Sequence, residues 1–191
     1  DVTDYSRGLD LDVALADVKY TCGGVRYERE YFTSYPDRVL AVRLSASRAG
    51  ALSFDCSLYD PFLRDYCIKE GDGCGKSATF SGEGNILSES GVSHYYNILF
   101  EARLTVLNFG GELKNENGKI SVSGADSAVL LFTRITGLRA AFSPRAIRKR
   151  NLLRIRIRMR CSAAYCAMPR HSAMTNSKGG TRRIIRHFFQ G

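Results

Sequence analysis

The sequence predicts an all-β protein, an antiparallel sandwich, and three observations carry that prediction. Apolar and polar residues alternate with period two over several runs of nine or ten residues. Turn-forming residues separate these runs, so that short strands recur about every 8–12 residues. No window of 11 or more residues within positions 1–143 shows a 3.6-residue apolar stripe, which disfavours helices.

Three runs show the alternation most clearly: Val39–Ser47, Ala51–Tyr59 and Ile98–Leu107. Alternate residues of a strand point to opposite faces of the sheet, so each run has one face that is expected to be buried. The residues on those faces are Leu40, Val42, Leu44, Ala46, Leu52, Phe54, Cys56, Leu58, Ile98, Phe100, Ala102, Leu104 and Val106. A fourth run, Ser127–Thr133, is apolar on both faces and is typical of a central strand.

Turn chemistry marks where these strands end. Gly23-Gly24 separates Val13–Cys22 from Val25–Ser34 and predicts a two-residue hairpin connection that tolerates positive φ. Further turns are expected at Tyr35–Asp37, Arg48–Gly50, Asn108–Gly111 and Asn117-Gly118. The segment Asp60–Asn97 is rich in glycine and has few periodic residues, so it is predicted to be a long irregular insertion.

The charge of the chain is divided sharply between its two parts. Residues 1–143 hold all 19 acidic residues and 15 Lys and Arg, a net charge of −4. Residues 144–191 hold 13 Lys and Arg and no acidic residue, a net charge of +13, and the two sum to the overall +9. The sequence therefore predicts a mildly acidic β domain at 1–143 and an irregular basic tail at 144–191.

Several classes of protein are disfavoured by the sequence. No stretch approaches 18 uninterrupted apolar residues, so a transmembrane helix is not expected. The chain starts at Asp1 with no charged and apolar leader, so no signal peptide is visible and the compartment (secreted, periplasmic or cytoplasmic) stays open. The chain is interpreted as an excerpt of a longer protein.

Motifs that could carry catalysis are weak. Gly71–Ser77 (GDGCGKS) is similar to the end of a phosphate-binding loop, but its first glycine is one position too close and no helix is expected to follow. His94, the one histidine of 1–143, has no nucleophile placed beside it by any motif. The carboxylate pairs Asp10/Asp12 and Glu28/Glu30 share strand faces, which permits acid–base chemistry but is equally typical of solvated faces.

The cysteines give no metal motif. None of Cys22, Cys56, Cys67, Cys74, Cys161 and Cys166 forms a C-x-x-C pair, so zinc is not expected. Cys56 is interpreted as a small core residue, and Cys67 and Cys74 could pair in an oxidising compartment or remain free thiols. No catalytic, cofactor-binding or metal-binding residue is predicted, and no cofactor.

Several stretches resemble the N-terminal β-sandwich domain of glycoside hydrolase family 95, whose members act as α-L-fucosidases or related exo-glycosidases. Tyr5–Asp12 (YSRGLDLD) is similar to that family's Y-x-R-x-L-D-L-D stretch, and Val18–Pro36 to its Gly-Val hairpin, Tyr-x-Arg-Glu strand and Ser-x-Pro. Asp37–Leu52, Phe100–Gly111 and Gly124–Phe132 continue the resemblance in the same order. It spans roughly residues 4–133 and is interrupted in the glycine-rich segment.

The resemblance implies a non-catalytic piece of an enzyme. The catalytic carboxylates and asparagines of that family come from a downstream (α/α)₆ barrel, so no catalytic residue carries over to this chain. The expected partners are that barrel and the fucosylated glycan on which the parent enzyme acts, with no specific nucleic acid and no membrane. The sandwich is expected to be incomplete, and its exposed strand edges are expected to make the chain associate.

Two alternatives of another class stay open. One is a free-standing carbohydrate-binding sandwich in which Tyr27, Tyr31, Tyr95 or Tyr96 stacks on sugar rings, although core tyrosines fit the pattern as well. The other uses the tail, where Leu153–Arg160 (LRIRIRMR) is a cationic amphipathic strand suited to nucleic acid or an anionic surface. The usual nucleic-acid modules are not recognisable in the sequence.

A frameshift in the encoding DNA explains the composition of the tail better than binding to nucleic acid or an anionic surface does. Codons compatible with Arg154–Arg160, read one register over, permit D-P-D-P-D-A. From Cys161 onward they permit Q-R-G-I-L-R-D-A-K-A-F-G-Y-D-E-L-K-R-R-H-A-A-D-Y-Q-A-L-F. The last part of that string resembles the family's linker helix between sandwich and barrel, which typically runs Y-D-E-L-x-x-R-H-x-A-D-Y-x-x-L-F. We therefore expect residues 144–191 to be a frameshifted linker, beginning between Thr133 and Arg150, that was never selected to fold.

Overall fold

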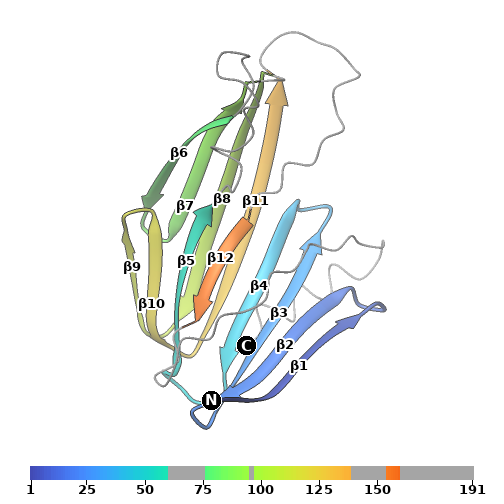
Figure 1. The fold of residues 1–191 in the computed structure, drawn as a ribbon, viewed down its shortest axis with the longest axis vertical. Coiled ribbons are helices and arrows are strands. Elements are labelled where there is room, and N and C mark those ends of the chain that lie inside the picture. Colours follow the sequence, from blue (N-terminus) through green and yellow to red (C-terminus); the bar gives the residue numbers. More distant parts are fainter. Residues whose placement is uncertain (60–75, 95–96, 139–153, 160–191) are drawn as a thin grey trace.

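The computed structural model describes residues 1–59, 76–94, 97–138 and 154–159 of the chain. Twelve β-strands form within these ranges, arranged as two antiparallel sheets (Figure 1). The larger sheet has the order β1 (Val2–Asp10), β2 (Leu15–Cys22), β3 (Val25–Ser34), β4 (Val39–Ala46), β11 (Ser127–Leu138), β8 (Ile98–Phe109), β7 (Ile86–Ser93) and β6 (Lys76–Glu83). The smaller has the order β12 (Arg154–Met159), β5 (Leu52–Tyr59), β10 (Lys119–Ala125) and β9 (Glu112–Glu116). The predicted all-β sandwich is confirmed.

The smaller sheet covers only part of the larger one. It contacts β4, β7 and β8 through β5 and β10, and β6 through β9. The strands β1 and β2 and the far ends of β6, β7, β8 and β11 extend beyond it (Figure 1). The face of the larger sheet turned toward the smaller one is called the inner face below, and the opposite face the outer face.

The core lies between the two sheets and uses the residues that the alternation predicted. Leu52, Phe54 and Cys56 of β5 and Leu104 and Val106 of β8 are each at most 1% exposed. The central strand β11 pairs with β4 on one side and β8 on the other, as its two apolar faces predicted. Its Val129 and Leu130 point to opposite faces, and both are essentially buried, as expected of a central strand.

The expected turns form where the sequence placed them. Gly23 and Gly24 both adopt positive φ and join β2 to β3, with Cys22 opposite Val25. Asn117 and Gly118 do the same between β9 and β10, with Glu116 opposite Lys119. Such turns match the right-handed twist of the strands they connect, and they fix the register of both hairpins.

The segment predicted to be an irregular insertion, Asp60–Asn97, contains two regular strands of eight residues each. Residues 76–83 and 86–93 pair in continuous register as the hairpin β6–β7, and that prediction is wrong there. Period two was hidden because serine and glycine occupy 7 of the 16 strand positions, and only Leu87, Glu89 and Ser93 of the hairpin are buried. Residues 60–75 lie outside the described part of the chain.

One strand of the smaller sheet comes from the basic tail. The tail was predicted to be irregular, but Arg154–Met159 within it forms a strand that pairs antiparallel with β5, from Arg154 opposite Tyr59 to Met159 opposite Phe54. The register therefore places Ile155, Ile157 and Met159 opposite the core positions of β5, Leu58, Cys56 and Phe54.

Candidate functional site

The two carboxylate pairs, Glu28/Glu30 and Asp10/Asp12, lie at positions where they contribute to the structure of the sheet and of a turn. Glu28 and Glu30 of β3 form ion pairs across the outer face, with Lys19 at 2.9 Å and Arg43 at 3.9 Å respectively. The hydrogen bond to Glu28 is the largest cause that raises the pKa of Lys19 above its usual value. These pairs cross-link β2, β3 and β4, so the two glutamates are engaged in holding neighbouring strands.

The second pair shapes a turn. The Oδ1 atom of Asp10 accepts hydrogen bonds from the backbone N–H groups of Asp12 (2.9 Å) and Val13 (3.4 Å). This arrangement is an Asx turn, and it leads the chain from β1 into β2. Asp10 and Asp12 are both exposed, so the structure does not bring them together in a cleft where one could act as acid and the other as base.

The end of the glycine-rich motif leads into a strand and not into the helix of a phosphate-binding loop. Lys76 and Ser77 open the strand β6, whereas a phosphate-binding loop requires a helix at this point. Lys76 lies over the ring of Phe100, with its Nζ atom 6.0 Å from the ring centroid. Ser77 Oγ lies 3.0 Å from Nε2 of His94, a neighbour that the sequence did not assign to this histidine.

Ser77 of this pair lines a hollow of about 610 Å³ at the uncovered end of the larger sheet. Most of its lining comes from outer-face positions: Val92, Leu99 and Ile135 supply apolar surface, and Ser77, Thr79 and Glu101 supply polar groups. Glu101 is held by Arg103 at 2.7 Å and His94 is exposed. A nucleophile needs a base that is itself oriented and a donor pair for the oxyanion, and among the described residues no such set surrounds Ser77.

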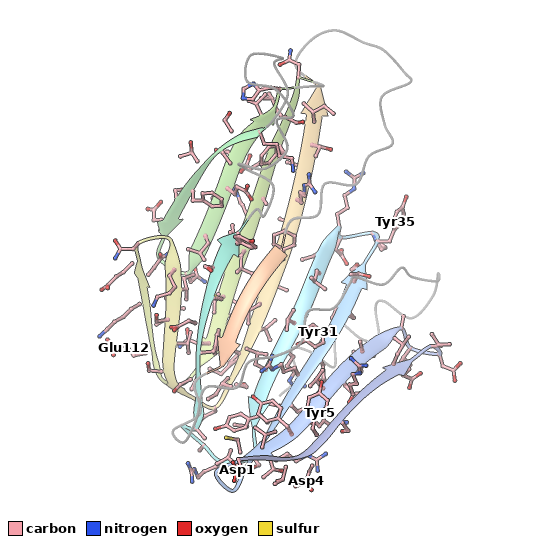
Figure 2. All side chains as sticks on the ribbon, viewed as in Figure 1. Asp1, Asp4, Tyr5, Tyr31, Tyr35 and Glu112 are labelled. Atoms are coloured by element: carbon pink, nitrogen blue, oxygen red, sulfur yellow. The ribbon has the colours of Figure 1, made fainter. Side chains whose placement is uncertain are left out.

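The tyrosines that were considered for stacking on sugar rings differ in how far they are buried. Tyr27 is 4% exposed, stacks on Tyr20 with ring centroids 5.3 Å apart, and donates a hydrogen bond from its hydroxyl to the Ala51 carbonyl. Its ring is therefore closed to a ligand, and the sugar-stacking role suggested for Tyr27 is wrong. Tyr31 is half-buried against the core (Figure 2). Tyr95 and Tyr96 lie outside the described residues.

Exposure singles out other tyrosines. Tyr35, at the β3–β4 turn, is 86% exposed, and Tyr5 on β1 is 48% exposed. Figure 2 shows them well apart, with Tyr35 projecting from its turn, so they do not form one stacking platform. Their places in the sequence could have separated exposed from buried tyrosines. Tyr35 lies within a turn motif, whereas Tyr20 and Tyr27 lie at the alternate positions of β2 and β3 that face the core.

Two buried charges are features that the sequence reasoning missed. Arg29 is 4% exposed, donates from Nη2 to the hydroxyl of Tyr20 at 3.3 Å, and packs over the Tyr20 ring at 5.6 Å. Glu89 is fully buried on the inner face of β7, and the register places it in one row with Ala102 and Arg134. Strand parity gave the signal for Glu89, because it lies two residues from the core residue Leu87.

The two described cysteines are both free and buried. Burial, with a contribution from neighbouring Asp55, raises the pKa of the Cys56 thiol to about 12, which fits the expected role as a core residue. Within the described ranges, no three His, Cys, Asp or Glu side chains gather as a metal site. No helix long and apolar enough to cross a membrane is present in those ranges either.

Comparison with known proteins defines the class of the domain. Residues 1–141 match the family described as glycosyl hydrolase family 65, N-terminal domain. The chain belongs to this family, and its two antiparallel sheets are the β-sandwich of a glycosyl hydrolase N-terminal domain. The expected glycoside hydrolase N-terminal domain is thus confirmed at this level, while membership of family 95 stays a prediction.

Short segments are also similar to fucosidases. Alpha-L-fucosidase 2 of Arabidopsis thaliana is 47% identical over 53 residues, which are 28% of this chain and 6% of that protein. An Aspergillus niger protein described as alpha-fucosidase A is 45% identical over 47 residues, 25% of this chain and 6% of that protein. A human-microbiome structure described as a kojibiose phosphorylase has a TM-score of 0.47 and 11% identity, covering 72% of this chain and 20% of that one.

Proposed function

We propose that this chain is a non-catalytic N-terminal sandwich of an α-L-fucosidase-like hydrolase of family 95 type. In the parent enzyme it packs on a downstream (α/α)₆ catalytic barrel and helps to shape the entrance for a fucosylated glycan. The observation that carries the proposal is the family match over residues 1–141 together with 45–47% identity to two fucosidases over segments of 47 and 53 residues.

The placement of the polar side chains supports a structural role. Glu28, Glu30 and Glu101 each form an ion pair with a lysine or arginine, and Asp10 holds a turn. Glycoside hydrolysis needs two carboxyl groups that face each other across a substrate, roughly 5–10 Å apart, with one of them kept protonated. The carboxylates of Glu28, Glu30 and Asp10 are engaged with neighbouring strands and a turn instead.

The first test is enzymatic. The purified chain is incubated with 4-nitrophenyl α-L-fucoside, with an active fucosidase as the positive control. We expect no release of nitrophenol above the rate in buffer. Hydrolysis by the chain that is abolished by one of its own carboxylate substitutions, such as Glu101→Gln, would overturn the non-catalytic role.

The second test addresses the missing partner. We propose that residues 144–191 are the frameshifted remnant of the linker to the barrel. Sequencing the encoding DNA from the codon for Ser127 to about a kilobase beyond Gly191 covers a further large domain. We expect the shifted frame to stay open and to encode a helical-repeat region. A shifted frame closed by stop codons would instead favour the basic tail as a genuine binder of anionic polymers.

A free carbohydrate-binding role has less support. Among its four tyrosines, Tyr27 is closed by packing on Tyr20 and Tyr31 is half-buried. Calorimetric titration with fucosylated oligosaccharides distinguishes the two roles, because a stacking platform would give saturable binding and the structural domain gives none.

A further inference from the structure

The four edge strands of the sandwich differ in how well they resist pairing with another chain. Natural sheets protect an edge with bulges, charged residues, prolines or short strands, because an open edge offers unpaired N–H and C=O groups. In the described part of the chain the edges are β1 and β6 in the larger sheet and β9 and β12 in the smaller one.

Three of these edges carry such protection. The register of β1 shifts between Thr3 and Ser6, where Asp4 has a positive φ, and the strand carries Asp4, Arg7 and Asp10. The strand β9 has five residues, three of which are charged. Arginine occupies every second position of β12.

The edge strand β6 has none of these devices in its middle. It pairs with β7 without a register shift over eight residues, from Lys76 opposite Ser93 to Glu83 opposite Ile86. Its sequence, KSATFSGE, has no proline, and its charges stand only at the two ends. From Thr79 to Glu83 every residue is exposed, including Phe80 at 39%.

We propose that β6 is a self-association edge at which a second copy of this chain adds antiparallel β6 to form a two-fold dimer. The ends of the strand favour this arrangement electrostatically. Antiparallel pairing brings the Lys76 end of one copy to the Glu83 end of the other, whereas parallel pairing would place like charges together.

Symmetry and sheet geometry then select the register. A two-fold axis perpendicular to the sheet keeps the inner faces of both copies on one side, so each residue pairs with a partner of the same parity. Centring the axis on Phe80 places the two Phe80 rings opposite each other, Thr79 opposite Ser81 of the second copy, and Ala78 opposite Gly82. The aromatic pair is thus flanked by small residues that leave room for both rings.

This inference is independent of the fucosidase proposal, because it uses only the edge strand and its neighbours. The experiment measures the oligomeric state of the full chain by sedimentation velocity from about 1 to 200 μM. We expect a reversible monomer–dimer equilibrium. The double variant Thr79→Lys/Ser81→Lys sets lysine opposite lysine twice and is expected to weaken dimerisation by about tenfold or more.

Two further arms make the test specific. The acidic variant Thr79→Glu/Ser81→Glu is also expected to be monomeric alone, and mixing it with the lysine variant is expected to restore dimers. The matched control, Thr3→Lys/Ser6→Lys, adds the same charge on β1 and is expected to leave dimerisation unchanged. Far-UV circular dichroism checks that every variant is folded.

A measurement on the unaltered chain covers the case in which the variants fail to fold. Amide exchange at low and high concentration is expected to show protection that rises with concentration in β6 and not in β1. A monomer at 200 μM, equal association of the β6 lysine variant, or concentration-dependent protection at another edge instead of β6 would each overturn the proposal.

Discussion

At the scale of single residues, glycines decide where the chain crosses between the sheets. Gly110 and Gly111 follow β8 and lead into β9 of the smaller sheet, and both adopt positive φ. A Cβ atom at Gly111 would lie 2.6 Å from the backbone nitrogen of Ala125 and would also meet the Ser123 carbonyl oxygen. This crossing is therefore closed to any side chain for two reasons, conformation and space.

A pair of matched substitutions separates those two reasons. Gly118 has nearly the same φ as Gly111, +70° against +69°, but nothing lies within 4 Å of a Cβ atom there. Gly118→Ala is expected to lower the free energy of unfolding by about 1–2 kcal/mol through backbone strain. Gly111→Ala is expected to cost about 1–3 kcal/mol more, because backbone must move to admit the methyl group.

Urea unfolding of both variants, followed by circular dichroism, measures the difference. Equal losses of stability at the two positions would contradict the close approach at Gly111.

The residue scale also shows why the tyrosines were hard to assign from sequence. Tyr20 and Tyr27 stack within the core beside Arg29, and Tyr31 on the same strand is half-buried. All three stand in well-formed alternating strands, and a tyrosine suits either a core or a wet surface because it has an apolar ring and a polar tip. Only tertiary packing decides which of these rings are covered, since Tyr20 and Tyr27 stack on each other and are buried while Tyr31 stays half-buried.

At the scale of elements, Asn115 joins the two sheets along one side of the sandwich. Its Nδ2 atom, on β9, donates to the carbonyls of Gly84 (3.0 Å) and Ile86 (3.1 Å) in the β6–β7 hairpin. Gly82 leaves space for this amide, since a Cβ atom there would meet Asn115 Oδ1. The β6–β7 hairpin buries few apolar side chains, so this bridge is an important part of what holds it to the smaller sheet.

Removing that bridge is expected to loosen the hairpin. Asn115→Ala deprives two backbone carbonyls of their donor and is expected to cost about 1–3 kcal/mol of stability. Amide exchange in β6 and β7 is expected to accelerate more than in β3 and β4, which the bridge does not touch. The control is the neighbouring Lys114→Ala, whose side chain is 61% exposed, and it is expected to change neither quantity.

The hairpin itself shows how a regular element escapes a pattern-based prediction. Its two strands contain five serines and two glycines among 16 residues, and one of their buried side chains is a glutamate. Period two in hydrophobicity needs apolar residues on the buried face, and here the buried face carries Leu87, Glu89, Gly91 and Ser93. Backbone pairing of β7 with the long strand β8 holds the hairpin in a regular sheet, although its hydrophobic pattern does not reveal a strand.

At the scale of the whole molecule, the question is whether the basic tail belongs to the domain. The family match ends at residue 141, and β12 begins at Arg154. This strand pairs with β5 on one side only, at the edge of the smaller sheet. Pairing at an edge is compatible with a sequence that was never selected to fold, because an Arg/Ile alternation meets the simple requirements of an edge strand.

The frameshift proposal predicts a weakly held strand. Amides of β12 are expected to exchange at least about tenfold faster than those at the centre of β11, since an unselected strand opens without unfolding the core. Hydrogen exchange read by mass spectrometry gives the comparison within one sample, and the central strand is the internal control. Protection of β12 equal to that of β11 would show that the tail is as stable as the body and would count against a frameshift.

The sequence by itself determined the class of this protein and most of its core. Period two fixes which side of each strand is apolar, as in Leu52, Phe54, Cys56 and Leu58, and paired glycine or Asn-Gly residues fix where hairpins turn. These are local properties, so they can be deduced without knowing which strands are neighbours. The motifs between residues 4 and 133, in their order along the chain, also indicated a glycoside hydrolase N-terminal domain, which the family match confirms.

Tertiary structure alone decided the rest. Strand order, the Ser77–His94 pair, the burial of Glu89 and the edge positions of β6 and β12 all depend on which segments lie side by side. Such contacts join residues far apart in the chain, and no local pattern encodes them. The place of a strand in its sheet also decides burial: Phe54 is sealed in the core, whereas Phe80 on the edge strand β6 is 39% exposed.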